Sequence, residues 1–308
     1  MLSLKYNFQI FDEYQQCGLL FKLFKKGLNQ RLWYIICQSF KNFYLSVKLG
    51  AQQSQWFCIK QGVHQGGPLS GMLFQIFFDD LLIALEKSAY GIKVHGVNVT
   101  CPSYADDVTI VSGSRNGLQK MLEIAYEYSC KWKFKFNPEK CVTLTFNRGK
   151  RRSQVVKMGE RDLKEVEFTN YLGTILSTKA QLEKEHIENR IQEAYKRTWL
   201  IKAIGCTTVQ INPVTFSKAY WSAVISKLCY GIFLMNTNDN VIQELEKLHV
   251  NIARNIQGLH ANVPAIVALA TVQWCRVTTF IEKELLNFMT QLMNKDCLCI
   301  YKRLVLHC

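Results

Sequence analysis

Tyr104-Ala105-Asp106-Asp107 is the stretch on which the fold of this chain depends. It lies between two short β-rich runs, Gly96–Thr100 and Val108–Ser112, and this pattern predicts a position at or beside a hairpin turn. Adjacent aspartates in a turn are usually only solvated, because Asp favours turns. A second acidic pair, Asp79-Asp80, falls inside a helical pattern and is interpreted as part of the solvent-exposed face of that helix. The neighbouring motifs must therefore decide whether Asp106-Asp107 carries chemistry.

Two further turn-forming stretches flank this tetrapeptide. The Gly-rich stretch Gln61–Ser70 lies about forty residues upstream, and Asn137-Pro138-Glu139-Lys140 lies about thirty residues downstream. Phosphoryl transfer to a growing strand needs carboxylates that hold two divalent ions, one at the attacking hydroxyl and one at the leaving pyrophosphate. Hard oxygen ligands suit Mg²⁺. A tight hairpin turn would present such carboxylates on a rigid platform.

The rest of the chain divides into a mixed half and a helical half. Apolar spacing predicts helices over 18–47, 70–87 and 116–132, a strand over Gln55–Lys60, strands on both sides of the Asn137 turn, and a hairpin near 168–176 with Gly173 as its turn residue. From about residue 180 the pattern is helical, and one helix is marked by Ile187, Ile191, Ala194 and Tyr195. Another is capped at Asp239 or Asn240, with an apolar stripe of Val241, Leu245, Leu248, Ile252 and Ile256 that ends at Gly258.

Charge points to a polyanionic partner. The 38 Lys and Arg exceed the 24 Asp and Glu by 14 in 308 residues. The cations concentrate in residues 1–60 and 129–157, where they alternate with aromatic residues, as in Lys133-Phe134-Lys135-Phe136. This alternation indicates first a strand with one buried face, and it also suits a wall that faces phosphates. The bland alternative is a soluble basic surface.

Composition also bears on the compartment. The 12 cysteines have scattered spacings, and no secretory leader is visible, so the sequence predicts reduced thiols in an intracellular protein, nuclear or cytoplasmic. No uninterrupted apolar run reaches ~18 residues, and we therefore expect no membrane span.

The motifs, taken in order, resemble those of a known family. Gln-Gly-Val-x-Gln-Gly-x-Pro-Leu-Ser from residue 61, Tyr-Ala-Asp-Asp from 104, Asn-Pro-x-Lys from 137 and Tyr-Leu-Gly from 171 resemble the reverse transcriptases of non-LTR retrotransposons. Group II intron enzymes are relatives and remain the alternative family. The stretch Gly18–Leu23 also resembles the segment after the first catalytic block of animal elements. The similarity covers roughly residues 11–290.

The resemblance implies an RNA-directed DNA polymerase that uses Mg²⁺, an RNA template, a DNA primer and deoxynucleoside triphosphates. Asp106 matches a direct metal ligand, and Asp107 supports the same metal site. Tyr104 matches a nucleotide-site residue that positions the primer end and the turn. Tyr171-Leu172-Gly173 matches the primer-grip hairpin.

The resemblance also assigns a nucleotide site. Gln65 and Gly66 match the loop against the incoming nucleotide and the template base. Phe11 matches the aromatic residue that packs under the sugar and rejects a 2′-hydroxyl. Lys140 matches a catalytic basic residue near the triphosphate, and Asn137 shapes its turn. Without the other motifs, Lys140 and Asn137 would be an ordinary turn and Phe11 a core residue.

The implied fold is α+β: a polymerase palm with an antiparallel sheet and backing helices, then a helical thumb and a helical C-terminal region. The implied domains are a palm over 1–177 with most of the fingers missing, a thumb over 178–235 and an extension over 236–308.

The family pattern breaks at its first block. The first metal-binding aspartate of the family lies five residues before the aromatic gate, and counting back from Phe11 gives Tyr6. Two hypotheses follow. The chain is an active polymerase whose true beginning supplies the missing block, or it is an inactive remnant that at most binds nucleic acid.

Overall fold

The computed structural model describes residues 2–7, 16–41, 43–59, 62–63, 66–105, 107–137, 139–146, 155–179, 181–203, 213–232 and 239–296, together with Lys302 and Leu304. Of residues 2–7 it describes the backbone alone. The chain divides into two compact units, Met1–Leu172 and Gly173–Cys308. Each unit is described by itself.

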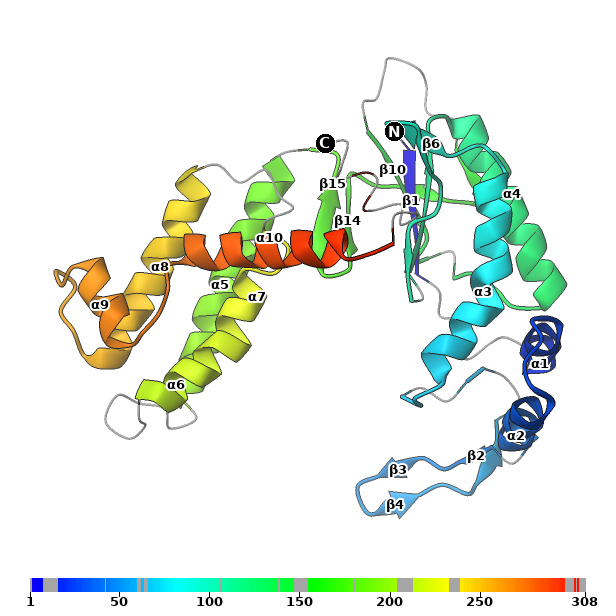
Figure 1. Ribbon diagram of the computed structural model, residues 1–308, viewed down its shortest axis with the longest axis horizontal. Helices are drawn as coiled ribbons and strands as arrows, with labels where there is room; N and C mark the ends of the chain where they lie inside the picture. The colour runs from blue at the N-terminus through cyan, green and yellow to red at the C-terminus, as the bar shows by residue number, and fades with distance from the viewer. Residues whose placement is uncertain are drawn as a thin grey trace. The chain divides into compact units, whose positions relative to one another are not determined.

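The first unit mixes strands with helices (Figure 1). Its helices are α1 (Gln16–Lys25), α2 (Gln30–Lys41), α3 (Ser70–Lys87) and α4 (Arg115–Trp132). Its strands are β1 (Leu2–Asn7), β2 (Tyr44–Leu45), β3 (Lys48–Leu49), β4 (Gln52–Gln53), β5 (Phe57–Cys58), β6 (Ile92–Val94), β7 (Val97–Val99), β8 (Ser103–Tyr104), β9 (Asp107–Ser112), β10 (Val142–Thr145), β11 (Lys157–Met158), β12 (Arg161–Asp162), β13 (Lys164–Glu165) and β14 (Phe168–Tyr171).

A five-stranded sheet organises this unit, in the order β13-β10-β1-β9-β8. The central strand, β1, pairs antiparallel with both β9 and β10, and only the edge strand β13 pairs in parallel, with β10. The sheet is therefore mainly antiparallel, as the sequence predicts.

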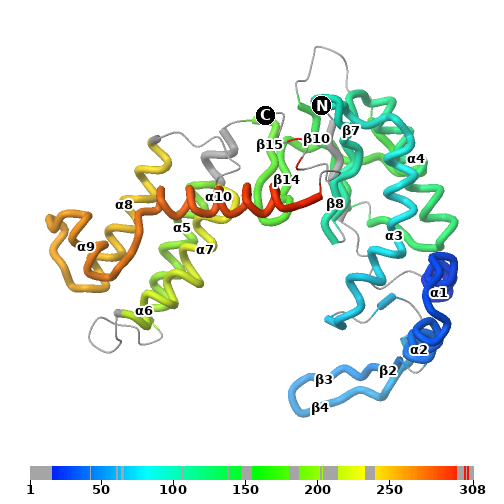
Figure 2. Tube along the Cα trace, in the orientation of Figure 1, coloured from blue at the N-terminus to red at the C-terminus, as the bar shows by residue number. Residues whose placement is uncertain are grey.

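Helices α3 and α4 lie side by side and pack on this sheet (Figures 1 and 2). They form because apolar residues recur at helical spacing: Leu73, Phe77, Leu81 and Leu85 on α3, and Leu118, Leu122 and Ala125 on α4, are all buried. The same apolar core contains Val108 and Ile110 of β9. The predicted bounds of both helices are confirmed to within one residue. This core fixes β9, and with it Asp107.

The helix predicted over 18–47 is wrong in its extent. The chain forms α1 and α2, separated at Gly27, whose φ is +78°, a value that glycine adopts without steric cost. The Gly27 and Leu28 amides close α1 by donating to the Phe24 and Leu23 carbonyls. The Asn29 side chain accepts the Arg31 amide at 2.9 Å, which starts α2. Residues 44–58 then form short strands.

Two other predictions are wrong in part. Of the two strands expected beside the Asn137 turn, β10 is present, but residues 134–137 form no strand and follow the end of α4 directly. The predicted strand over Gln55–Lys60 reduces to β5, within the described residues.

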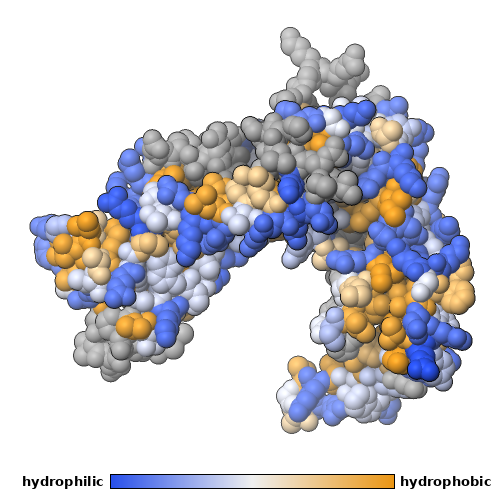
Figure 3. All heavy atoms as spheres, in the orientation of Figure 1, coloured by the Kyte–Doolittle hydropathy of each residue, from blue (hydrophilic) through white to orange (hydrophobic). Residues whose placement is uncertain are grey.

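The apolar surface of the first unit is concentrated near its N-terminal helices. Helix α2 has no buried residue, and its Leu32, Tyr34 and Ile35 are each more than half exposed. Phe24 of α1 is 68% exposed. On the face drawn in Figure 3, apolar residues gather on the side of α1 and α3.

The second unit is mainly helical. After β15 (Thr174–Ser177) come α5 (Gln181–Ala203), α6 (Pro213–Tyr220), a π-helical turn (Trp221–Ile225), α7 (Ser226–Leu228), α8 (Asp239–Gln257), α9 (Ala265–Thr271) and α10 (Val277–Met293). The predicted stripe of α8 is confirmed: Leu245, Leu248, Ile252 and Ile256 are buried, and Gly258 ends the helix with a φ of +65°. The helix marked by Ile187, Ile191, Ala194 and Tyr195 is present as α5, in which Ile187 and Ala194 are buried and Tyr195 is 51% exposed.

Candidate active site

The predicted hairpin at the acidic tetrapeptide is confirmed. Strands β8 and β9 pair antiparallel, with Tyr104 opposite Asp107. Ala105 in the connection has a φ of +50°, a left-handed conformation typical of a tight turn. Asp106 lies outside the described residues. Asp107 is half-buried at the first position of β9, and Tyr104 is 67% exposed.

Strand β9 is held firmly behind this turn. Its residues Val108, Ile110 and Val111 are all buried. Its outer side is covered by the extended chain before β8, since the Val111 amide donates to the Thr100 carbonyl at 2.7 Å and the Thr109 amide to the Pro102 carbonyl at 2.9 Å. The turn thus stands on a strand that is paired on both sides, and this gives Asp107 a fixed position.

The neighbouring strand brings position 6 beside the acidic turn. In the antiparallel pairing of β1 with β9, Asn7 is opposite Asp107 and Tyr6 is opposite Val108. The position that matches the family's first aspartate therefore lies next to the hairpin carboxylates along the sheet. None of the six residues of β1 is acidic. Phe11 and Asp12 lie outside the described residues.

The Asn137 turn reaches the same end of the sheet. Asn137 forms an Asx turn, because its side chain accepts the Glu139 amide at 3.1 Å and its carbonyl accepts the Lys140 amide at 3.2 Å. Lys5 of β1 is opposite both Thr109 and Val142, so β9 and β10 run in the same direction from this end. Lys140 precedes Val142 by two residues, and Asp107 precedes Thr109 by two residues. Both therefore lie at the same end of the sheet, and Lys140 is exposed.

The Gly-rich loop leads directly into α3. Gly62 and Gly66 have φ values of +74° and +84°, in the left-handed region that glycine favours. Gly66 is exposed, and a side chain added there would meet no atom within 4 Å. The loop ends where the Ser70 amide donates to the Gly67 carbonyl at 3.2 Å. Gln65 lies outside the described residues, so the shared cavity predicted for Phe11, Gln65 and Asp106 is not tested.

The predicted hairpin near 168–176 is present. Strands β14 and β15 pair, and Leu172 and Gly173 between them have φ values of +48° and +79°. Arg190 of α5 donates to the Gly173 carbonyl at 2.8 Å and to the Lys227 carbonyl at 2.6 Å. Its guanidinium also lies over the Tyr230 ring, 5.6 Å from the ring centroid. Arg190 thus ties the turn residue Gly173 to the end of α7.

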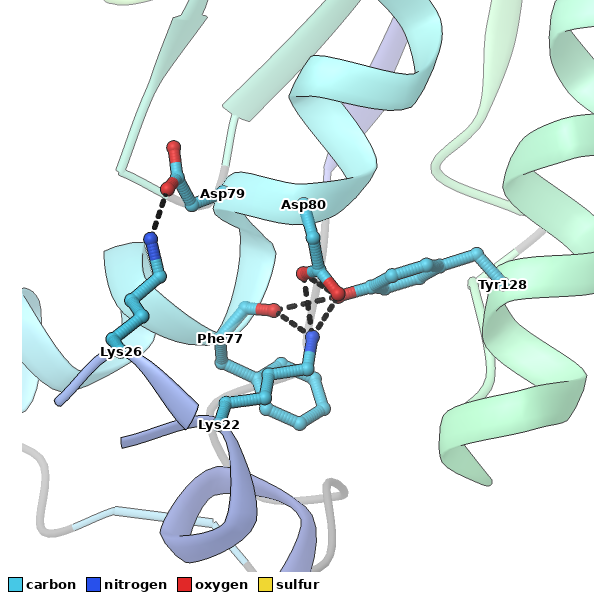
Figure 4. A network of polar contacts seen from close by, with 6 residues as sticks. All are labelled: Lys22, Lys26, Phe77, Asp79, Asp80 and Tyr128. Carbon is cyan, nitrogen blue, oxygen red and sulfur yellow. Dashed lines mark hydrogen bonds and ion pairs between the residues drawn. The ribbon is translucent and has the colours of Figure 1, made fainter. Parts of the chain in front are cut away.

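A polar network that the sequence did not reveal joins α1, α3 and α4 (Figure 4). Lys22 of α1 is 6% exposed and donates to the Phe77 carbonyl at 2.5 Å and to the Asp80 carboxylate at 2.6 Å. It also bonds the Tyr128 hydroxyl, which lies 2.7 Å from the same Asp80 oxygen. Asp79 is paired with Lys26 at the surface.

Three aromatic rings surround this buried ammonium. Lys22 Nζ lies 4.4, 4.7 and 4.1 Å from the ring centroids of Phe77, Tyr128 and Trp132. Burial lowers the pKa of Lys22 from 10.5 to about 8, and the Asp80 carboxylate opposes this change. Burial also raises the pKa of Tyr128. Asp79 and Asp80 are thus partners of α1 lysines, and the interpretation as a merely solvent-exposed helix face was incomplete.

Among the described residues, the acidic turn contributes one carboxylate, Asp107, to this end of the sheet. A two-metal site draws carboxylates from more than one strand. Here the acidic turn supplies Asp107 and the undescribed Asp106, while β1 supplies none. No group of three or more His, Cys, Asp or Glu side chains with metal-binding geometry occurs among the described residues. Among the same residues, no helix is long and apolar enough to cross a membrane.

Comparison with known families agrees with this geometry. Residues 10–176, more than half of the chain, match the model of the family described as reverse transcriptase (RNA-dependent DNA polymerase). The chain therefore belongs to the reverse transcriptase family.

Its relatives include enzymes of non-LTR retrotransposons. The chain is 28% identical over 262 residues to the RNA-directed DNA polymerase from the mobile element jockey of Drosophila funebris, covering 81% of this chain and 27% of the relative. It is 35% identical over 91 residues to the Pol polyprotein of the type-2 retrotransposable element R2DM of Drosophila melanogaster, covering 30% of this chain and 8% of the relative. An R2 polyprotein of Popillia japonica is 20% identical over 274 residues, 82% of this chain and 43% of the relative. The chain thus spans less than half of each of these relatives.

Among solved structures, the chain is similar to apo telomerase from Candida tropicalis. The form truncated from its C-terminal domain has a TM-score of 0.42 at 18% identity and covers 57% of this chain and 34% of that chain. The other form has a TM-score of 0.39 at 13% identity, and the match covers 88% of this chain and 46% of the telomerase chain.

Proposed function

We propose that this chain is the RNA-directed DNA polymerase core of a non-LTR retrotransposon. The observation that carries the proposal is the Tyr104–Asp107 hairpin, held on an inner strand beside β1 and at the same end of the sheet as the Asn137 turn. In this proposal residues 1–177 form the polymerase palm. The thumb occupies 178–235 and the extension 236–308.

The proposed roles follow the family resemblance, and the exposure of Tyr104 and Lys140 supports them. Asp107 and Asp106 would hold Mg²⁺, which reverse transcriptases generally use, and the ion would stabilise charge on the transferring phosphate. Lys140, exposed at the end of its Asx turn, would meet the triphosphate. Tyr104, exposed at the hairpin, would position the primer end, with Gln65, Gly66 and Phe11 around the nucleotide. Tyr171-Leu172-Gly173 would grip the primer.

A second candidate is a catalytically inactive member that only binds nucleic acid. The absence of a carboxylate from β1 specifically favours it, because the first metal ligand of the family has no equivalent at Tyr6. Both candidates require binding to RNA and DNA, and they differ only in the chemical step.

Binding is the first test of both candidates. Equilibrium titration of a labelled RNA–DNA primer-template at several salt concentrations should show affinity that falls steeply with salt. The expected log–log slope is about −0.7 to −0.9 per phosphate contacted. Binding that ignores salt, or that is absent at ~50 mM salt, would contradict both candidates.

Primer extension then separates the candidates. Incorporation of deoxynucleotides on an RNA template in Mg²⁺ would favour the active polymerase, provided that it is lost in Asp106→Asn. Binding without incorporation would favour the inactive nucleic-acid-binding protein.

A further inference from the structure

A groove lies at the C-terminal end of α4. It has a volume of about 690 Å³ and runs between the segment 133–137 and the hairpin of β11 and β12. Its lining residues come from these two segments and from the last turns of α4: Tyr126, Ser129, Cys130, Lys133, Phe134, Lys135, Phe136, Asn137, Met158, Glu160 and Arg161. All of them belong to the first unit.

The local sequence explains why a groove forms here. Lys133 ends α4 with a φ of +55°, and the Phe134 amide donates back to the Ser129 carbonyl at 3.2 Å. The chain then runs extended, with Phe134 and Phe136 buried and Lys135 exposed between them. Met158 is also buried. The groove therefore has an apolar floor in the core of the unit and a polar rim.

The rim is positively charged and carries one accessible ring. Lys133, Lys135 and Arg161 are all exposed, against the single carboxylate Glu160. Tyr126 is 41% exposed, and its ring packs directly over Gly159, where an added Cβ would lie 2.5 Å from the ring. Only a glycine leaves room for the ring in this position.

We propose that this groove binds a single-stranded nucleic-acid segment, with a base stacked on Tyr126 and phosphates on Lys133, Lys135 and Arg161. Three exposed cations on the rim of one groove suit several phosphates of a strand better than a single anion. A rigid aromatic ring between cations is the usual way in which proteins bind single strands without reading sequence. The inference rests on the proposed function, because a polymerase core meets unpaired template, but the groove contains neither Tyr104 nor Asp107.

Cys130 offers a local probe, since it is exposed and lines the groove. The full chain is treated with iodoacetamide with and without a thymidine strand of about 12 nucleotides, and alkylation is mapped by mass spectrometry. We expect the strand to slow alkylation of Cys130 several-fold and to leave Cys58, an exposed cysteine of β5, unchanged. Equal rates at Cys130 with and without the strand would overturn the proposal. Protection by polyglutamate as strong as by the strand would also overturn it, because an acidic peptide would then be the better occupant.

Matched variants test the charge and the ring separately. The triple variant Lys133→Gln, Lys135→Gln, Arg161→Gln should reduce the salt slope of strand binding by about 2, at about 0.7 per lost contact. The control triple Lys48→Gln, Lys87→Gln, Lys93→Gln removes the same charge from exposed positions of the same unit and should change the slope by less than about 1. Equal losses in the two triples would mean diffuse attraction only, and the groove would be rejected.

The ring is tested with Tyr126→Leu. This variant should weaken binding of the thymidine strand about five-fold or more and leave an abasic strand of the same length unaffected. Equal weakening for both strands would contradict stacking on Tyr126. If the unmodified chain binds no nucleic acid at all, the proposed function fails with the groove. If it binds without protecting Cys130, only the groove fails.

Discussion

Asn7 of β1 is the backbone partner of Asp107 of β9, so Tyr6, one residue earlier, lies beside Val108. This places the family's first-aspartate position next to the acidic turn along the sheet. The residue there is a tyrosine, a residue type whose reference pKa is near 10 and which is ordinarily neutral at pH 7. A neutral phenol does not replace a carboxylate as a ligand of Mg²⁺.

We therefore predict that the chain as given does not extend a primer. Loss of one carboxylate from a metal site removes several kcal/mol of transition-state stabilisation, at least about a hundredfold in rate. The measurement is primer extension on an RNA template with Mg²⁺. Extension by the unmodified chain that disappears in Asp106→Asn would show that another group supplies the ligand.

The second prediction concerns the buried Lys22. Its pKa is lowered to about 8 in the folded chain and is 10.5 in the unfolded chain. Between these values the unfolded chain holds a proton that the folded chain has lost, so stability should rise with pH across this window, by on the order of 2 kcal/mol. Below pH 8 both states are protonated and the contribution is constant. Denaturant unfolding at pH 7.5 and pH 9.5 measures the change.

Lys22→Met should remove this pH dependence. The apolar side chain would fill the space among Phe77, Tyr128 and Trp132, and the half-exposed Asp80 would keep its contact with Tyr128. Stability at pH 7 should stay within about 1.5 kcal/mol of the unmodified chain. The control Lys26→Met breaks only the exposed pair with Asp79 and should cost less than about 1 kcal/mol and keep the pH dependence. If the free energy of unfolding still rises with pH in Lys22→Met, the pH dependence belongs to another group.

The sequence predicts the helices of the core better than it predicts the segments that pack against them. The bounds of α3 and α4 follow from apolar spacing, which is local information. The break at Gly27 was also visible, because glycine followed by Asn29 is a pattern typical of a helix end and a new cap. The long apolar run over 18–47 outweighed that signal in the prediction.

Contacts between residues far apart in the chain could not be predicted from the sequence. Residues 133–136 alternate exposed and buried as a strand would, but α4 ends directly before them and no strand in the described part of the chain pairs with them. The register of β1 joins residues about a hundred positions apart, and spacing alone does not specify it. From the sequence of α1 alone, Lys22 would be predicted to be a solvated lysine. Its ammonium is buried only because α3 and α4 pack around it.

The third prediction concerns acid stability in the second unit. His249 of α8 is fully buried, and burial lowers its pKa from 6.5 to about 4, opposed by its bond to the Cys275 carbonyl. A carbonyl only accepts, so Nε2 carries the proton and donates to Cys275 at 3.0 Å, and Nδ1 accepts from the Tyr220 hydroxyl at 2.9 Å. Between pH 6.5 and 4 the unfolded chain binds the additional proton, and stability should fall as pH falls through this window.

Thermal unfolding at pH 7, 6, 5 and 4 checks this expectation, with His249→Gln as the test variant. A glutamine amide still has a donor for the Cys275 carbonyl but does not titrate, so its pH profile should be flatter even though its stability at pH 7 is lower. His260→Gln is the matched control, because His260 is exposed. An unchanged profile in His249→Gln would place the acid sensitivity elsewhere.

The last prediction concerns Arg190, which holds the proposed primer-grip turn. Its two terminal nitrogens donate to the carbonyls of Gly173 and Lys227, and a single ammonium does not reproduce that fork. Arg190 is 7% exposed, so little water reaches the two carbonyls that it binds. A carbonyl that loses the Arg190 donor therefore stays without a hydrogen bond. Arg190→Lys should therefore cost about 1.5–3 kcal/mol in unfolding free energy. Amide hydrogen exchange should rise in 173–177 and 226–230 before other parts of the unit.

The control is Lys196→Met on the same helix, which removes only an exposed pair with Glu193 and should cost less than about 0.5 kcal/mol. If the turn also grips a primer, Arg190→Lys should weaken primer-template binding more than it weakens binding of a single strand, because the turn would face the primer side of a duplex. Equal weakening of both ligands would leave Arg190 with a structural role alone. Stability and exchange indistinguishable from those of Lys196→Met would show that the two carbonyls find other donors, and that Arg190 does not fix the Gly173 turn.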